Sequence, residues 1–199
     1  MNHLLHLYLV DPHPECRLGA LFGDYVKGPL DQRLPDGIRH GIMHHRRLDS
    51  FAETSVVFRR SRKRLNPALR HCRGILVDMA YDHFLAQNWE TYHHQPLEDF
   101  ATSIYRLLQH HQSTLPKRLQ ASLPRMLAAN WLVALRHIEH IDSVLHRLAS
   151  RLSRPNLLAT GKAEILRNRH GLEADFTAFM VECRHRFQSP PSRHLMQSR

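Results

Sequence analysis

The sequence predicts an all-α protein, and three observations support this fold class. Apolar residues recur every three or four positions over most of the 199 residues, which is the period of an amphipathic helix. Only eight glycines occur, and nothing alternates like a strand apart from a weak candidate at 4–10. Because 42% of the residues are hydrophobic, the chain can bury a core of its own. We therefore expect a single-domain bundle of about seven or eight helices.

The individual helices are predicted from apolar repeats and from start signals. In chain order, Pro35 and Asp36 indicate the start of one helix, and Asn66 and Pro67 the start of another with proline in its first turn. Apolar repeats predict the remaining helical stretches at 18–25, 69–84, 97–108, 117–129, 130–151, 156–170 and 172–187. The last residues, 188–199, are typical of a disordered tail, so the helical domain is predicted to span 1–187.

The charge of the chain indicates an acidic partner. The 28 Lys and Arg against 18 Asp and Glu leave a formal net charge of +10, which attracts polyanions over long range. Nucleic acid, a phosphorylated small molecule, an anionic membrane and an acidic protein all fit this charge. No run is long enough to span a membrane and the N-terminus lacks a signal-peptide pattern, so we expect a cytoplasmic protein. Three widely spaced cysteines favour neither disulfides nor a zinc site.

Much of the positive charge is concentrated between residues 59 and 73, which we call the basic segment. No acidic residue occurs within it. A run of cations often forms only a solvated helix face, but the missing acids also favour a binding surface. The candidate partner-binding residues are Arg59, Arg60, Arg62, Lys63, Arg64, Arg70 and Arg73.

Acidic residues and histidines are embedded among apolar residues in the first half of the chain. His45 and Asp49 are four positions apart, so both can face one centre from the same side of a helix. Asp78 and Asp82 repeat this spacing. Because an unpaired carboxylate is costly to bury, converging acids and imidazoles indicate a metal site. The candidate ligands are Asp24, His45, Asp49, Asp78, Asp82 and His6, and His83 is a further candidate beside them.

The mixture of donors indicates the kind of metal and its chemistry. Carboxylate oxygens together with imidazole nitrogens suit manganese, iron or magnesium, whereas zinc more often has cysteine or additional histidines. Such a metal lowers the pKa of a bound water and polarises a phosphoryl oxygen, which is the chemistry of phosphoester hydrolysis. Each residue also has a structural interpretation: Asp49 could pair with Arg46 or Arg47, and Asp78 with Arg73.

Four segments in residues 1–89 resemble the acyl carrier protein phosphodiesterases, relatives of the HD-type metal-dependent phosphohydrolases. These segments are MNHLLHLYL, GALFGDYVKG, GIMHHRRLDSFAE and VDMAYDHFLAQNW, and they stand in the family order at similar spacing. A later segment, NWLVALRHIEHIDSVLHRLASR, matches more loosely. Three positions depart from the family pattern: Ala20 replaces an Asn, Gly23 replaces another small residue, and Glu53 stands where Asp is common.

The resemblance implies an HD-like, manganese-dependent enzyme, with Mg²⁺ or Fe²⁺ as other possible metals. It implies cleavage of the phosphodiester between 4′-phosphopantetheine and a serine of acyl carrier protein. Our mechanistic hypothesis is direct in-line attack by metal-bound hydroxide, without a covalent enzyme intermediate. Asp24 is then the first site candidate, and Arg46 and Arg47 would hold phosphate oxygens. His83 or His45 would protonate the leaving serine oxygen. The basic segment would receive the acidic carrier protein. The oligomeric state stays open.

Two alternatives remain at this point. An HD-type phosphohydrolase acting on a nucleotide or another small phosphoester would use the same metal site but would not need the basic segment. A basic helical protein that binds nucleic acid would use the segment and no metal. No zinc-finger, RNA-recognition or winged-helix signature supports this second alternative, and aromatic residues are not interleaved with the arginines.

Overall fold

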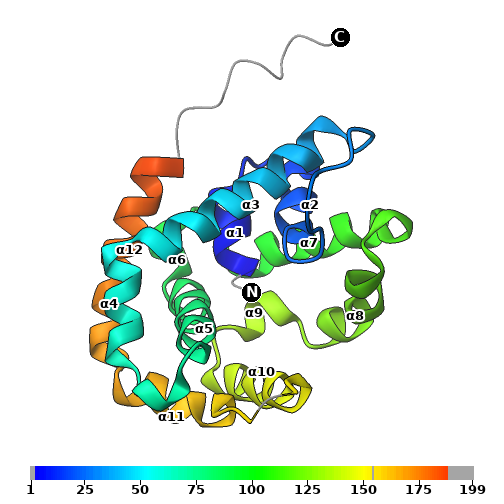
Figure 1. Cartoon of the computed structure of the whole chain (residues 1–199). Coiled ribbons are helices and arrows are strands. Elements are labelled where there is room, and N and C mark those ends of the chain that lie inside the picture. Colours follow the sequence, from blue (N-terminus) through cyan, green and yellow to red (C-terminus); the bar gives the residue numbers. More distant parts are fainter. Residues whose placement is uncertain (1–2, 154, 188–199) are drawn as a thin grey trace.

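The computed structural model describes residues 3–153 and 155–187, in which all regular secondary structure is helical (Figure 1). This confirms the predicted all-α class. The predicted tail at 188–199 lies outside the described residues. The α-helices are α1 (His3–Leu9), α2 (Pro14–Phe22), α3 (Asp36–Thr54), α4 (Val56–Arg64), α5 (Cys72–Gln87), α6 (Trp89–Tyr92), α7 (Leu97–His110), α8 (Lys117–Ala128), α9 (Trp131–Ala134), α10 (Ile138–Arg151), α11 (Gly161–Arg167) and α12 (Arg169–Phe187). Three 3₁₀ helices lie at Pro67–Leu69, Gln112–Thr114 and Leu158–Thr160.

The twelve α-helices in the described residues exceed the seven or eight that we expected, because α1, α4 and α6 were not predicted as separate helices and one predicted stretch is divided. The stretch at 130–151 contains α9 and α10, and the stretch at 156–170 contains a 3₁₀ turn followed by α11. The start signal at Pro35 and Asp36 does begin α3. At Asn66 and Pro67 the chain instead forms one 3₁₀ turn, and α5 begins only at Cys72.

The candidate strand at 4–10 is wrong, because α1 covers His3–Leu9. Five of the seven residues of α1 are buried, so apolar side chains face several directions and the helical period is lost from the sequence. Asp82 of α5 stabilises the start of this short helix. Its carboxylate oxygens accept hydrogen bonds from the backbone N–H groups of Leu4 and Leu5, at 3.1 and 2.9 Å. These groups have no partner within their own helix.

Two glycines bring the backbones of α2 and α3 into contact. A Cβ atom added to Gly19 would lie 2.2 Å from the carbonyl oxygen of Ile38, and one added to Gly41 would lie 2.1 Å from that of Cys16. Both distances are far below van der Waals contact, so these positions have no room for a side chain. The contact fixes the end of α2 beside the middle of α3.

The long helix α5 lies in the interior of the bundle, with buried residues on several of its faces. Helices α1, α4, α10, α11 and α12 pack against it. In Figure 1, α4 and α12 run side by side along one edge of the molecule, and they are also in contact. No helix of the described residues combines the length and apolar character that crossing a membrane requires.

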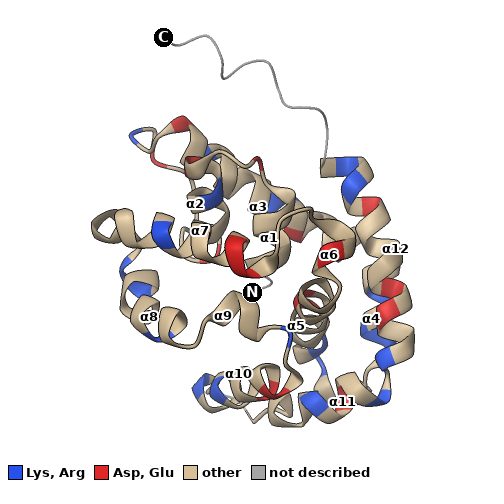
Figure 2. Cartoon of the chain, turned by 180° about the vertical axis from the view of Figure 1, so that it is seen from behind, with Lys and Arg blue, Asp and Glu red and all other residues tan. Residues whose placement is uncertain are grey.

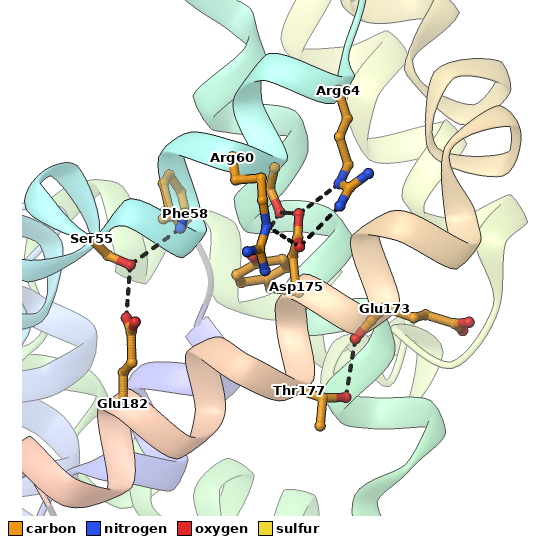
Figure 3. Close-up of polar contacts among 10 residues, drawn as sticks. Ser55, Phe58, Arg60, Arg64, Glu173, Asp175, Thr177 and Glu182 are labelled. Atoms are coloured by element: carbon orange, nitrogen blue, oxygen red, sulfur yellow. Dashed lines mark hydrogen bonds and ion pairs between the residues drawn. The ribbon is translucent and has the colours of Figure 1, made fainter.

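A buried carboxylate joins α12 to α4 (Figure 3). Asp175 is fully buried and accepts hydrogen bonds from the Nε atoms of Arg60 and Arg64, at 2.6 and 2.7 Å. The hydroxyl of Ser61 donates to the same carboxylate at 3.0 Å. The two arginines remain partly exposed to water, whereas the carboxylate is completely shielded from it.

A second link fixes the first turn of α4. The hydroxyl oxygen of Ser55 accepts a hydrogen bond from the backbone N–H of Phe58 at 3.2 Å, as an N-cap residue does. The same hydroxyl donates to Glu182 of α12 at 2.8 Å. Helix α4 is therefore attached to α12 along its whole length.

The variant Asp175→Asn should lower the free energy of unfolding by about 2–3 kcal/mol, because it removes the charge that balances Arg60 and Arg64 while keeping the side-chain volume. Chemical denaturation measures this change. The control is Glu173→Gln on the same helix, whose ion pair with Arg169 is half-exposed and should contribute less than about 1 kcal/mol. Equal losses in both variants would contradict the assignment.

The acid limb of the stability curve gives a second check on the same variant. Burial alone would raise the pKa of Asp175. Hydrogen bonds from Arg64, Arg60 and Ser61 lower the pKa by more than burial raises it, so in the folded protein it lies below its usual range. The stabilisation is then complete above about pH 4 and is lost as the pH falls through the folded-state pKa. Asp175→Asn should flatten the stability curve below pH 4, and an unchanged slope would contradict this account.

Candidate metal centre

Helices α1 and α3 bring His6, His45 and Asp49 together. One nitrogen or oxygen atom from each side chain lies within 4.8 Å of the other two, as ligands of one metal ion would. The Nε2 atoms of both histidines lie 3.2 Å from oxygens of Asp49. The two imidazole rings stack, with 3.7 Å between their centroids. The group combines two nitrogen donors and a carboxylate, a set that suits several divalent transition metals.

Asp24, in the turn after α2, lies beside this group. Its Oδ1 atom is 3.9 Å from Nε2 of His45, and its Oδ2 atom is 3.1 Å from Nε2 of His3. Sequence reasoning did not single out His3. The available signal was its spacing of three residues from His6, which places both on neighbouring turns of one helix.

The contacts of the two stacked histidines are those expected of metal ligands. Nδ1 of His45 lies 2.7 Å from the carbonyl oxygen of Ala20, which only accepts, so Nδ1 carries the proton. Nε2 therefore presents a lone pair to Asp49 and Asp24, and that contact is repulsive without a cation. Neither buried ring nitrogen of His6 has a well-aligned hydrogen-bond partner in the part of the chain that the structure describes. Both observations fit a bound metal.

The electrostatics of the group agree with this interpretation. Burial lowers the pKa of His6 to about 3, so its imidazole is neutral at pH 7. Burial alone would raise the pKa of Asp49, but the contacts with His45 and His6 hold it below its usual range. The pKa of Asp24 is also low despite burial, because of its hydrogen bond to the histidine at the start of α1. Ionised carboxylates thus face a neutral imidazole.

A groove of about 640 Å³ lies next to the group. Asp49 and Asp78 both line it, together with Arg62, Arg70 and Arg73 of the basic segment. Burial raises the pKa of Asp78 to about 6, and the nearby carboxylates act in the same direction. The groove therefore joins the acidic centre directly to a wall that carries cations.

Two further candidates have other partners. Both oxygens of Asp82 accept hydrogen bonds from the start of α1, as described above. Nδ1 of His83 donates to the carbonyl oxygen of Leu135 at 2.7 Å, and this fully buried ring belongs to the packing of α5 against the chain after α9. Neither residue joins the ligand group, so we do not carry them into the proposal below.

The two arginines of α3 differ from the predicted phosphate clamp. Arg46 is half-buried, and its Nη2 atom donates to the carbonyl oxygen of Val26 at 2.9 Å. It thus holds the loop that follows Asp24. Arg47 is exposed and lines another cavity, which contains none of the residues of the ligand group.

Several cations of the basic segment already have acidic partners in the fold. Arg60 and Arg64 bind Asp175, while Arg62 pairs with Glu53 of α3. The basic segment itself contains no acidic residue, but the neighbouring helices α3 and α12 supply the acidic partners. Figure 2 shows Lys and Arg along α4 beside the acidic residues of these helices. In the described part of the chain, no carboxylate lies within ion-pair distance of the others, which are Arg59, Lys63, Arg70 and Arg73.

Comparisons with known proteins identify the family. The family described as "Acyl carrier protein phosphodiesterase" matches residues 1–183. Curated relatives named acyl carrier protein phosphodiesterase include proteins from Serratia proteamaculans (32% identical), Pectobacterium atrosepticum (27%) and Escherichia coli O6:H1 (28%). Each comparison covers 90% of this chain and 93% of the relative. No solved structure gives a significant match. The chain therefore belongs to the acyl carrier protein phosphodiesterase family.

Proposed function

We propose that this protein hydrolyses the phosphodiester between 4′-phosphopantetheine and a serine of acyl carrier protein, giving the apo carrier and free phosphopantetheine. One observation carries the proposal: Asp49 belongs both to the ligand group and to the wall of the groove that holds Arg62, Arg70 and Arg73. An anionic phosphodiester would meet cations and the metal centre in the same groove. The relatives are named for acyl carrier protein, which we take as the substrate.

We propose Mn²⁺ as the metal, with Mg²⁺ or Fe²⁺ as alternatives. His6, His45 and Asp49 would hold it, and Asp24 and Asp78 are the nearest additional carboxylates. A divalent metal bound there lowers the pKa of a coordinated water and polarises a phosphoryl oxygen.

The side chains around this group have positioning tasks. The carbonyl oxygen of Ala20 holds the tautomer of His45 that presents Nε2 to the centre. His3 holds one oxygen of Asp24 and leaves the other directed toward His45. In the groove, Arg70 and Arg73 have no acidic partner among the described residues, so their charges are available to phosphate oxygens.

Loss of the carboxylate in Asp49→Asn should abolish metal binding and activity together. We expect holo carrier protein incubated with the wild type and Mn²⁺ to lose the mass of phosphopantetheine. The variant should be slower by more than about 100-fold, since even neighbours of metal ligands contribute 10- to 100-fold. Asp36→Asn, at the exposed start of the same helix, is the matched control. A folded Asp49→Asn protein with wild-type metal content and turnover would refute the proposed site.

Gly23 controls where the imidazole of His45 lies. A Cβ atom added to Gly23 would lie 2.2 Å from Cγ and 2.5 Å from Cδ2 of that ring. A methyl group would therefore push the imidazole away from Ala20 and from the carboxylates. This is a constraint on the metal centre rather than on the hydrophobic core.

The variant Gly23→Ala should weaken Mn²⁺ binding by about ten-fold or more while the protein stays folded. Isothermal titration calorimetry measures the affinity, and circular dichroism checks the fold. Gly74→Ala is the control, because its added Cβ would have no atom nearer than 3.9 Å and alanine favours the helix. Equal Mn²⁺ affinities in the two variants would show that Gly23 does not position a ligand.

The unpaired cations of α4 should serve the protein substrate alone. Arg59 and Lys63 are exposed, one turn apart, and do not line the groove. Arg59→Glu combined with Lys63→Glu should lower kcat/KM for the carrier by about ten-fold or more, mainly through slower association. Turnover of a small phosphodiester such as bis(p-nitrophenyl) phosphate should be unchanged.

The control for this charge reversal is Lys117→Glu, which changes an exposed cation of α8. Added salt should reduce carrier turnover by the wild type and have little effect on the double variant. If the double variant processes the carrier normally, the carrier does not dock on α4. A chain that accepts only the small phosphodiester would instead support the alternative of a small-molecule phosphohydrolase.

A further inference from the structure

A second cavity, of about 1330 Å³, lies apart from the metal centre. Residues of α1, α3, α6 and α12 contribute to its wall, but none of His6, His45 and Asp49 lines it. Arg17, Arg47, Arg184, Arg186 and four histidines do, and Asp11 is the one acidic residue among the described residues of the wall. We call this space the basic cavity. Figure 2 shows part of its charge as Lys and Arg at the end of α12.

The four arginines of the basic cavity lack acidic partners. Within residues 3–153 and 155–187, no carboxylate lies within ion-pair distance of any of them. Aromatic rings hold three of them instead, with 5.1–5.3 Å between the guanidinium carbon and the ring centroid: Arg17 over Phe100, Arg184 over Tyr92 and Arg186 over Phe51. Arg184 also donates hydrogen bonds from Nε and Nη2 to the hydroxyl of Tyr8, at 3.1 and 2.9 Å, so its Nη1 group is the one left for an anion. A ring contact alone, as for Arg186, leaves the N–H groups of the guanidinium available.

Buried polar atoms without partners lie in the same wall. His44 is only 5% exposed, and neither of its ring nitrogens has a well-aligned hydrogen-bond partner in the described part of the chain, where the backbone of Leu9 is the nearest polar neighbour that acts on the ring. The same holds for the buried Nε atom of Arg17. Buried polar groups are nearly always hydrogen-bonded in folded proteins. These donors therefore indicate a ligand that supplies acceptor oxygens.

We propose that the basic cavity binds a small molecule that carries a phosphate group. Phosphate oxygens match the planar forks of Arg47 and Arg186, and an N–H of His44 can donate to the same group. Arg184 adds its positive charge and its Nη1 group. The donors of His44 and Arg17 are buried, so a small ligand reaches them more readily than the surface of a protein would. The cavity is large enough for a nucleotide-sized molecule. The site shares no residue with the metal centre and does not depend on the function proposed above.

Pyrophosphate is the probe that tests this site in the full chain. Calorimetry should show one binding event without added metal, and the histidine side-chain NMR signals of His44 should shift. Arg186→Gln should weaken this binding by about ten-fold or more, as expected when a charged hydrogen-bond donor is lost. Arg59→Gln removes the same charge from α4, which does not line the basic cavity, and should leave the pyrophosphate affinity unchanged.

Two further arms separate the basic cavity from its competitors. Asp49→Asn should retain the pyrophosphate affinity of the wild type. If this variant no longer bound pyrophosphate, the anion would bind at the metal centre, and the proposal would be overturned. Equal weakening by Arg186→Gln and Arg59→Gln would indicate a diffuse charge effect and would also overturn it. If apo carrier protein displaced pyrophosphate and Arg186→Gln abolished that competition, the cavity would be a protein-docking surface, and the small-molecule proposal would be wrong.

Discussion

The close contact between Gly19 and Gly41 is the constraint on which the geometry of the candidate metal centre depends. It allows the backbones of α2 and α3 to touch, and any side chain at either position would force the helices apart. Helix α2 carries the carbonyl oxygen of Ala20 that fixes His45, and it ends just before Asp24. Separation of the helices would therefore move both partners of His45 at once. Glycine lowers the stability of a helix, but at these two positions it is the residue that lets α2 and α3 approach closely enough to place Ala20 and Asp24 beside His45.

Carboxylates at the helix contacts of this fold differ in the groups that face them. Asp82 accepts hydrogen bonds from backbone N–H groups at the start of α1, and Asp175 accepts them from two arginines. Asp49 instead faces the lone pair of His45 and the neutral ring of His6. Of these three arrangements, the last is the one that a divalent cation would complete. The same residue type thus caps a helix, joins a helix pair or belongs to a candidate metal-binding group.

The sequence predicted those features that depend on nearby residues. The apolar period predicted most long helices, and the spacing of His45 and Asp49 placed them on one side of α3. The apolar period failed to predict α1, because the residues of this helix are buried on several sides. The sequence also offered no sign of the acidic partners of the basic segment. Asp175 lies more than 100 positions from Arg60 and Arg64, and only the packing of α12 on α4 brings them together. Local sequence carries no record of such pairs.

The adjacent residues His44 and His45 show how helix geometry assigns opposite tasks to one residue type. Successive side chains on a helix point about 100° apart, so α3 directs His45 to the metal centre and His44 to the basic cavity. Ala20 fixes the proton of His45 on Nδ1, which leaves a lone pair for a metal. His44 has no well-aligned acceptor of this kind in the described residues, so its ring is less firmly fixed and can turn an N–H toward a ligand in the cavity. An anchored imidazole suits a cation, and a less firmly fixed one among arginines suits an anion.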